Sequence, residues 1–176
     1  LDNDCDGLVN EGLIPRPCDM GLGPQSGQQS CGPYDSSWSP CYSLWKHRIR
    51  LTIPAHNLDS SPNNLPVLVQ LWEPQIDYAK IAANGADIRF INENHTELLP
   101  FEIETWNPDE SSNIWVLIPQ VSADQDTHFW MYYDYQGDNL QPITTNPWAN
   151  QYEVVYHFES PTNGGTFLDS SPNENS

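Results

Sequence analysis

Six apolar segments between residues 45 and 136 are separated by short stretches rich in Asn, Asp, Ser and Pro, and this spacing constrains the fold most. The first, WKHRIRLTI, alternates apolar and basic residues, as a half-buried strand does, whereas LPVLVQLW is apolar enough to be buried on both faces. With gaps this short and so little helix, the sequence predicts an all-β fold, an antiparallel β-sandwich of the jelly-roll or Ig-like kind.

The expected sandwich spans residues 45–136, with six or seven strands and one short helix around residues 77–84 that ends at Gly85. The apolar positions of the strands predict a core, which we expect to include Ile49, Leu51, Val67, Val69, Ile88, Phe90, Ile103, Val116 and Ile118.

The first twelve residues, LDNDCDGLVNEG, place carboxylates at alternating positions before a glycine. Calcium takes six to eight oxygen ligands and tolerates irregular geometry, so it would relieve the repulsion within such a loop. The alternating carboxylates follow the spacing of the ligands in an EF-hand calcium loop. The last ligand of such a loop is a Glu, but Leu13 stands at that position here, and Glu11 is the nearest residue that could replace it. The alternative is a solvated acidic turn. The expected calcium ligands are Asp2, Asp4, Asp6, the Leu8 carbonyl, Asn10 and Glu11.

All four cysteines, Cys5, Cys18, Cys31 and Cys41, lie in the first quarter of the chain, and none has the C-x-x-C spacing typical of zinc sites. Two disulfides in an oxidising compartment are therefore expected. Three pairings are possible, and proximity in sequence favours Cys5–Cys18 with Cys31–Cys41. No apolar run is long enough to span a bilayer, and there is no initiator Met or signal peptide, which predicts a mature exported protein at the cell surface or outside the cell.

The charge is strongly acidic, with a formal net charge of −18, and no Lys or Arg follows Arg89. Binding to nucleic acid or docking on an anionic membrane needs a basic footprint, so the sequence argues against both. The scattered acids are best interpreted as solvated surface.

Catalytic motifs are missing from the sequence. Glu102 and Glu104, two apart on an expected strand, share a face at ~7 Å, but a glycosidase pair must flank the scissile bond from opposite sides. The five histidines lie in separate segments without metal-binding spacing. We therefore expect a protein that is not an enzyme.

Aromatic residues suggest a second class of function. Sugars dock on flat aromatic faces, and the tryptophans least constrained by the strand pattern are Trp72, Trp130 and Trp148. A role in the core is the alternative for each of them.

Two stretches resemble known families. LDNDCDGLVNEG, with the cysteines of residues 18–41, is similar to a metal-binding motif next to a Cys-rich stretch in secreted bacterial surface proteins. WKHRIRLTI, LPVLVQL, NGADIRF, LLPFEIETW, NIWVLIP and FWMYY resemble, in this order, a β-sandwich family of unknown function in bacterial and archaeal surface proteins. YYDYQGD departs from that family's usual ending.

In that family a concanavalin A/laminin-G-like domain commonly follows, and YEVVYHFES with FLDSSPNENS resembles its beginning. The resemblance implies three parts: a Cys-rich calcium segment at 1–44, the sandwich at 45–136, and a linker with the first strand of a truncated lectin-like domain at 137–176. Residues 152–158 would pair either within their own chain or with a sheet edge of another copy, building a filament.

Two functions follow as expectations. The first is a non-catalytic structural or adhesive module of an exported protein, stabilised by calcium, whose partners are copies of itself or other surface proteins. The second is a carbohydrate-binding module that serves a larger extracellular protein and binds polysaccharide.

Overall fold

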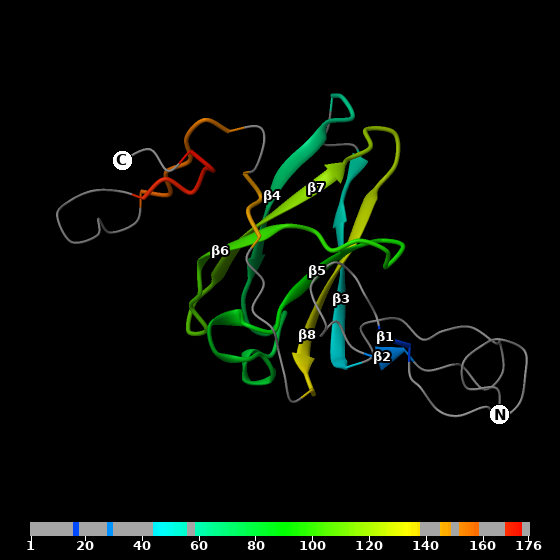
Figure 1. Cartoon of the computed structure of the whole chain (residues 1–176), viewed down its shortest axis with the longest axis vertical. Helices are drawn as coiled ribbons and strands as arrows, with labels where there is room; N and C mark the ends of the chain where they lie inside the picture. The colour runs from blue at the N-terminus through cyan, green and yellow to red at the C-terminus, as the bar shows by residue number, and fades with distance from the viewer. Residues whose placement is uncertain are drawn as a thin grey trace, which may run out of the picture. The chain divides into compact units, whose positions relative to one another are not determined.

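The structure is a computed structural model that describes residues 44–55, 59–137, 145–148, 152–158 and 168–173, together with the backbone of 16–17 and 28–29. Two short strands, β1 (Arg16–Pro17) and β2 (Gln28–Gln29), pair antiparallel. The other strands form two three-stranded sheets, in the orders β3–β8–β5 and β4–β7–β6 (Figure 1). The chain divides into two compact units, and each sheet lies mainly in one of them.

The first unit contains the sheet of β3 (Trp45–Ile53), β8 (Thr127–Tyr135) and β5 (Arg89–Asn92). β8 is the central strand, and β5 pairs with it antiparallel, with Phe90 opposite Met131. Both of these side chains are fully buried, and they lie at the centre of this unit's core. β3 is an edge strand whose burial alternates along its length, as the sequence predicts for a strand with one buried face.

Two charged residues of the GADIRF segment are buried in the first unit. Asp87 accepts hydrogen bonds from the backbone N–H groups of Ala82 (2.9 Å) and Tyr135 (3.0 Å), and its carbonyl accepts one from the Trp45 indole (2.7 Å). Arg89 donates to the carbonyls of Ala86 and Ile88. Buried charges need such partners. Through its bonds to Trp45 and Tyr135, Asp87 also joins the start of β3 to the end of β8.

The second unit contains the sheet of β4 (Asn63–Leu71), β7 (Ser112–Gln120) and β6 (Phe101–Thr105). The central strand β7 pairs antiparallel with both neighbours. Its side chains alternate between buried and half-buried, so that Ile114, Val116 and Ile118 form one buried row.

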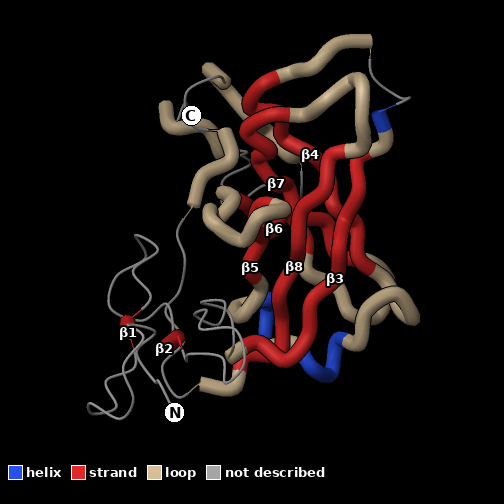
Figure 2. Tube along the Cα trace, turned by 90° about the vertical axis from the view of Figure 1, so that its right-hand side faces the viewer, coloured by secondary structure: helices blue, strands red, loops and turns tan. Residues whose placement is uncertain are grey.

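Helix is confined to single turns in the described residues. The expected helix around residues 77–84 is instead two 3-10 turns, Tyr78–Lys80 and Ala83–Gly85, which are among the few helical segments in Figure 2. The reason is local: Asn84 adopts a left-handed backbone (φ 58°), which an α-helix cannot contain. None of the helices in the described part has the length and apolarity to cross a bilayer.

The strands confirm the all-β prediction, with two antiparallel sheets and strand positions close to those expected. Of the predicted core, Val69, Ile88, Phe90, Val116 and Ile118 are buried, whereas Ile49, Leu51, Val67 and Ile103 are half-buried.

Candidate functional site

A cluster of carboxylates, indoles and one histidine occupies one face of the β4–β7–β6 sheet. Glu102 of β6 lies directly opposite Trp115 of β7 in the antiparallel register. The pairing register of β6 with β7 shifts between Ile103 and Thr105. Glu104 lies at this shift, and its Oε2 accepts a hydrogen bond of 2.8 Å from the Trp115 indole.

Residues far along the chain complete this cluster. The Trp148 indole donates to Glu102 Oε2, and the Ser170 hydroxyl donates to Glu102 Oε1 at 2.8 Å. His157 lies between the two carboxylates, with Nε2 3.5 Å from Glu102 Oε2 and Nδ1 3.4 Å from Glu104 Oε1. We call this set, Glu102, Glu104, Trp115, Trp148, His157 and Ser170, the carboxylate cluster.

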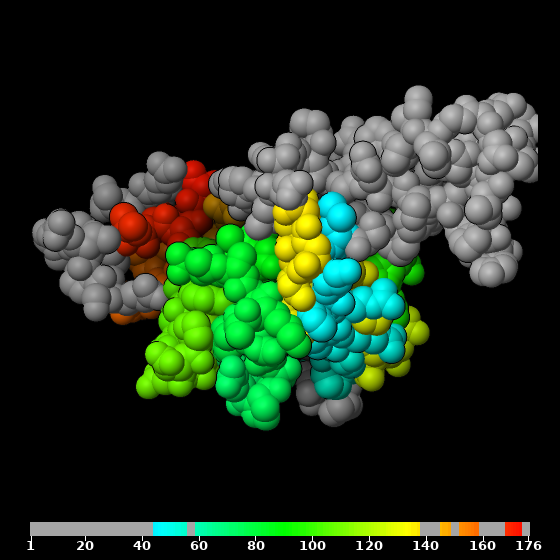
Figure 3. All heavy atoms as spheres, turned by 90° about the horizontal axis from the view of Figure 1, so that it is seen from below, coloured from blue at the N-terminus to red at the C-terminus, as the bar shows by residue number. Residues whose placement is uncertain are grey.

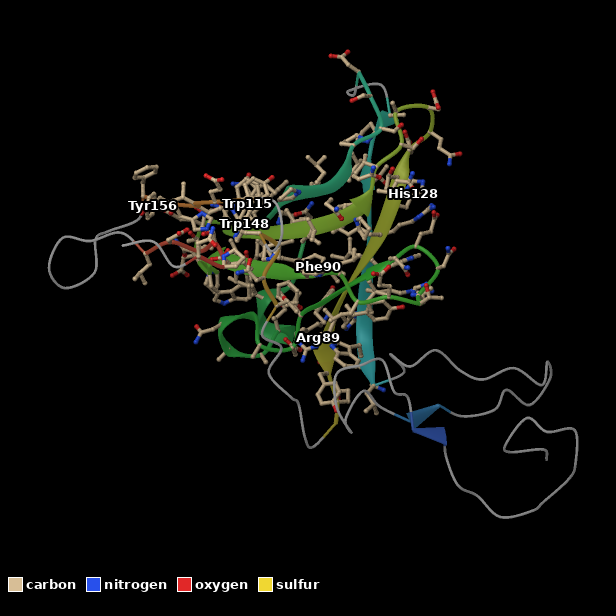
Figure 4. The ribbon with its side chains drawn as sticks, turned by 45° about the horizontal axis from the view of Figure 1, so that its top comes forward. Arg89, Phe90, Trp115, His128, Trp148 and Tyr156 are labelled. Atoms are coloured by element: carbon tan, nitrogen blue, oxygen red, sulfur yellow. The ribbon has the colours of Figure 1, made fainter. Side chains whose placement is uncertain are left out.

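The aromatic rings of the cluster contact one another. Trp148, only 5 % exposed, lies 5.3 Å from Trp115 and 5.8 Å from His157 between ring centroids, and Tyr152 meets it edge-on. Figure 4 shows Trp115 and Trp148 side by side. The rings partly shield the carboxylates from water, and this strengthens their hydrogen bonds.

Each of the four carboxylate oxygens of Glu102 and Glu104 therefore has a partner within the protein. His157 Nε2 is buried and makes no hydrogen bond, and it lies 3.5 Å from Glu102 Oε2. The two ring nitrogens thus each lie near a carboxylate oxygen. The contacts of this site join β6 and β7 to residues far along the chain.

The same distant part of the chain also protects the edge of β6. Among the described strands β6 pairs with β7 alone, and the Thr145 hydroxyl accepts from the N–H of Phe101 (2.9 Å) and donates to its carbonyl (2.8 Å). A side chain thus takes the place of a neighbouring strand, which blunts an edge that could otherwise pair with another chain.

Residues 145–148, 152–158 and 168–173, the C-terminal segment, are also held to one another. Tyr156 forms an antiparallel bridge with Asp169, and Ser170 N–H donates to the Val155 carbonyl at 2.9 Å. These contacts lie within the chain, and the choice expected for residues 152–158 between pairing in their own chain and pairing with another copy stays a prediction. The domain boundary expected after residue 136 stays a prediction; the structure adds that residues beyond it bond to Phe101 and Glu102 of β6.

The expected calcium ligands and disulfides lie outside the described residues, so both stay predictions. They comprise Asp2, Asp4, Asp6, Leu8, Asn10 and Glu11 with Cys5, Cys18, Cys31 and Cys41. In the part of the chain that is described, no group of three His, Cys, Asp or Glu side chains is placed to hold a metal ion.

The three tryptophans proposed for glycan stacking lie in different surroundings. Trp72 follows β4 and is 44 % exposed, so a ring face is available to a sugar. Trp130 is half-buried and already stacks with His95 and with the Arg48 guanidinium, 4.6 Å from its centroid. Trp148 is buried in the carboxylate cluster. The stacking hypothesis is therefore best kept for Trp72.

Sequence reasoning identified Glu102 and Glu104 as a pair on one face but missed His157 and Ser170. Each is more than fifty residues from Glu104, and neither has a spacing that reports a contact. Only the fold brings them together.

The described part of the chain is thus an all-β fold. The oxygens of its carboxylate cluster are partnered by residues of the same chain. A model of the family described as "Domain of unknown function (DUF2341)" matches residues 84–169. The chain is thus similar to a family of unknown function, as the strand motifs indicated. The matched range includes strands β5 to β8 and every residue of the carboxylate cluster except Ser170. No curated protein and no solved structure matches the chain.

Proposed function

We propose that this chain is a non-catalytic structural or adhesive module of an exported protein at the cell surface or outside the cell. The observation that supports this proposal is the internal pairing of the carboxylate cluster. A catalytic carboxylate must reach substrate, whereas the oxygens of Glu102 and Glu104 are used to hold β6, β7 and the C-terminal segment together.

In this proposal the two sheets are the layers of one β-sandwich, and residues 1–44 form a segment held by disulfides and calcium. Copies of the chain or other surface proteins are its partners. Self-assembly by strand addition is tested by light scattering before and after deletion of residues 150–176: a large assembly that collapses to monomer supports a filament, and a monomer in both cases rules it out.

The test of the non-catalytic role uses Glu102→Gln and Glu104→Gln. We expect the wild-type protein to release no reducing ends from a panel of polysaccharides, and we expect both variants to unfold at lower temperature. Hydrolysis by the wild type that disappears in either variant, with the fold intact, would contradict the proposal.

A carbohydrate-binding module is the second candidate, and the exposure of Trp72 favours it. Trp72 follows a strand whose exposed face also carries Gln70, and Gln70 donates to Asn113 at 3.3 Å. Amides beside an open indole can bind sugar hydroxyls while the ring stacks. Saturable quenching of tryptophan fluorescence by a soluble polysaccharide, lost in Trp72→Ala, would support this function over the structural one.

A further inference from the structure

Half of the chain's six basic residues lie on the exposed face of one strand. Lys46, Arg48 and Arg50 alternate along β3, and all three are exposed, whereas their neighbours in the strand are half-buried. Residues two apart on a strand are ~7 Å apart on the same face, so the three charges form a regular row. We call it the cationic strand face.

Contacts within the first unit hold two of these cations in place. Arg48 stacks over the Trp130 ring, and its Nη1 donates to the Tyr132 hydroxyl at 3.3 Å. Arg50 pairs with Glu93 at 2.8 Å, and both side chains are about half exposed. A guanidinium carries five donors in a planar fork, so one contact leaves Arg48 able to bind a carboxylate. Lys46 makes no ion pair with any described residue.

The cationic strand face is exceptional in this chain. The formal net charge is −18, and Arg89, another of the six bases, is buried. β3 is also an edge strand that lies at the surface beside β8 (Figure 3), so that an extended ligand can run along it. A row of cations kept exposed in an acidic protein indicates a ligand with complementary negative charge.

We propose that the cationic strand face binds a linear polysaccharide bearing carboxylates, with its chain running along β3. A polymer with charges repeated along its length matches cations repeated along a strand, and the Arg fork binds a carboxylate through two hydrogen bonds. Trp130, which stacks with Arg48, holds that guanidinium on the exposed side of the strand. Duplex nucleic acid fits less well, because its dense charge would meet the acidic remainder of the protein.

This inference goes beyond the proposed function and does not depend on it, because its residues are separate from the carboxylate cluster. The experiment measures binding of the whole chain to polygalacturonate by affinity electrophoresis, with dextran as the uncharged polymer. EDTA is present throughout, so that calcium at the acidic N-terminal loop plays no part.

We expect polygalacturonate, but not dextran, to retard the protein. Lys46→Gln and Arg48→Gln should each weaken binding about two- to fivefold, the size typical of an exposed ion pair. Arg48→Lys keeps the charge but not the fork and should lose less affinity than Arg48→Gln, and Lys80→Gln, which removes an exposed base elsewhere, should change nothing. Lys46 has no described ion pair to lose, so its variant reports on binding even if Arg48→Gln impairs folding.

Three results would overturn the proposal. The first is equal retardation by dextran, and the second is equal loss of binding in Lys80→Gln and Lys46→Gln. The third is tighter binding to poly-glutamate or to duplex DNA than to polygalacturonate at the same ionic strength, which would assign the face to a different polymer.

Discussion

At the scale of single residues, Glu102 joins separate parts of the chain. Its two oxygens accept from Trp148 and Ser170, and His157 Nε2 lies 3.5 Å away. These partners lie 46 to 68 residues further along the sequence. Removing the Glu102 carboxylate therefore leaves two partly buried donors, the Trp148 indole and the Ser170 hydroxyl, without this acceptor.

We expect Glu102→Ala to lower the free energy of unfolding by ~2–4 kcal/mol, because an orphaned buried donor costs about 1–3 kcal/mol and here two are orphaned. Urea denaturation followed by tryptophan fluorescence measures the change. Glu73→Ala, at an exposed position, serves as the control and should stay within ~0.5 kcal/mol of wild type. Equal stability of the two variants would contradict the structural role of Glu102.

His95 is the residue for which the structure gives a pH dependence. Burial, and then the positive charge of Arg48, lowers the pKa of His95 below its ordinary value. The neutral ring fits its contacts, since Nδ1 lies 2.9 Å from the Tyr132 hydroxyl, to which Arg48 donates. The unfolded chain therefore binds this proton more readily than the folded one.

The sign of the effect follows from linkage. The stabilising contribution of neutral His95 is complete above the unfolded pKa of ~6.5 and is lost as the pH falls through the lowered folded pKa. We expect wild type to lose stability relative to His95→Gln as the pH drops from about 7 to about 5. Urea denaturation at several pH values measures this difference. Arg48→Gln should reduce the slope, and a difference independent of pH would show that His95 does not titrate in this way.

At the scale of elements, β6 is a five-residue strand at the edge of its sheet among the described strands, and a side chain bonds to its backbone there. Thr145 uses one hydroxyl as both donor and acceptor to Phe101, which occupies two backbone groups that a neighbouring strand would otherwise satisfy. Short, capped edges of this kind resist pairing with other chains.

Thr145→Val keeps the shape of the side chain and removes both hydrogen bonds. We expect it to lower the free energy of unfolding by about 1–3 kcal/mol, the cost of leaving partly buried backbone groups unpaired. Thr145→Ser keeps the hydroxyl and is the matched control. If thermal denaturation gives the same midpoint for both variants, the hydroxyl does not protect the edge.

The elements also show what could be predicted from sequence. β3 and β8 begin and end where the corresponding apolar segments of the sequence do, because turn residues flank both; β3 alternates as a strand with one face to bury, whereas β8 is buried on both faces. The helix around residues 77–84 was predicted wrongly, since its composition suits a helix but Asn84 takes a left-handed backbone. The sequence predicts only part of the carboxylate cluster, because alternation along a strand places Glu102 and Glu104 on one face. His157, Trp148 and Ser170 join them through contacts between distant segments, and such contacts leave no local pattern in the sequence.

At the scale of the whole molecule, the acidic N-terminal loop is the expected source of ligand-dependent stability. A cation that binds only the folded chain stabilises it by mass action, by ~2.7 kcal/mol at a hundred times its dissociation constant. We expect calcium to raise the thermal midpoint and EDTA to reverse the rise, measured by calorimetry. The double variant Asp4→Asn with Asp6→Asn should respond to neither, and identical melting curves for wild type in calcium and in EDTA would exclude a calcium site.

The hydrogen bonds between β6 and residues beyond 144 affect when this sheet can finish folding during synthesis. Synthesis proceeds from the N-terminus, so β4, β6 and β7 leave the ribosome before Thr145, Trp148, His157 and Ser170 exist. Until then Phe101 lacks the Thr145 hydroxyl, and Glu102 lacks the donors that the finished chain supplies. The hydrogen bonds of this part of the sheet can therefore be completed only after the last of these residues has emerged.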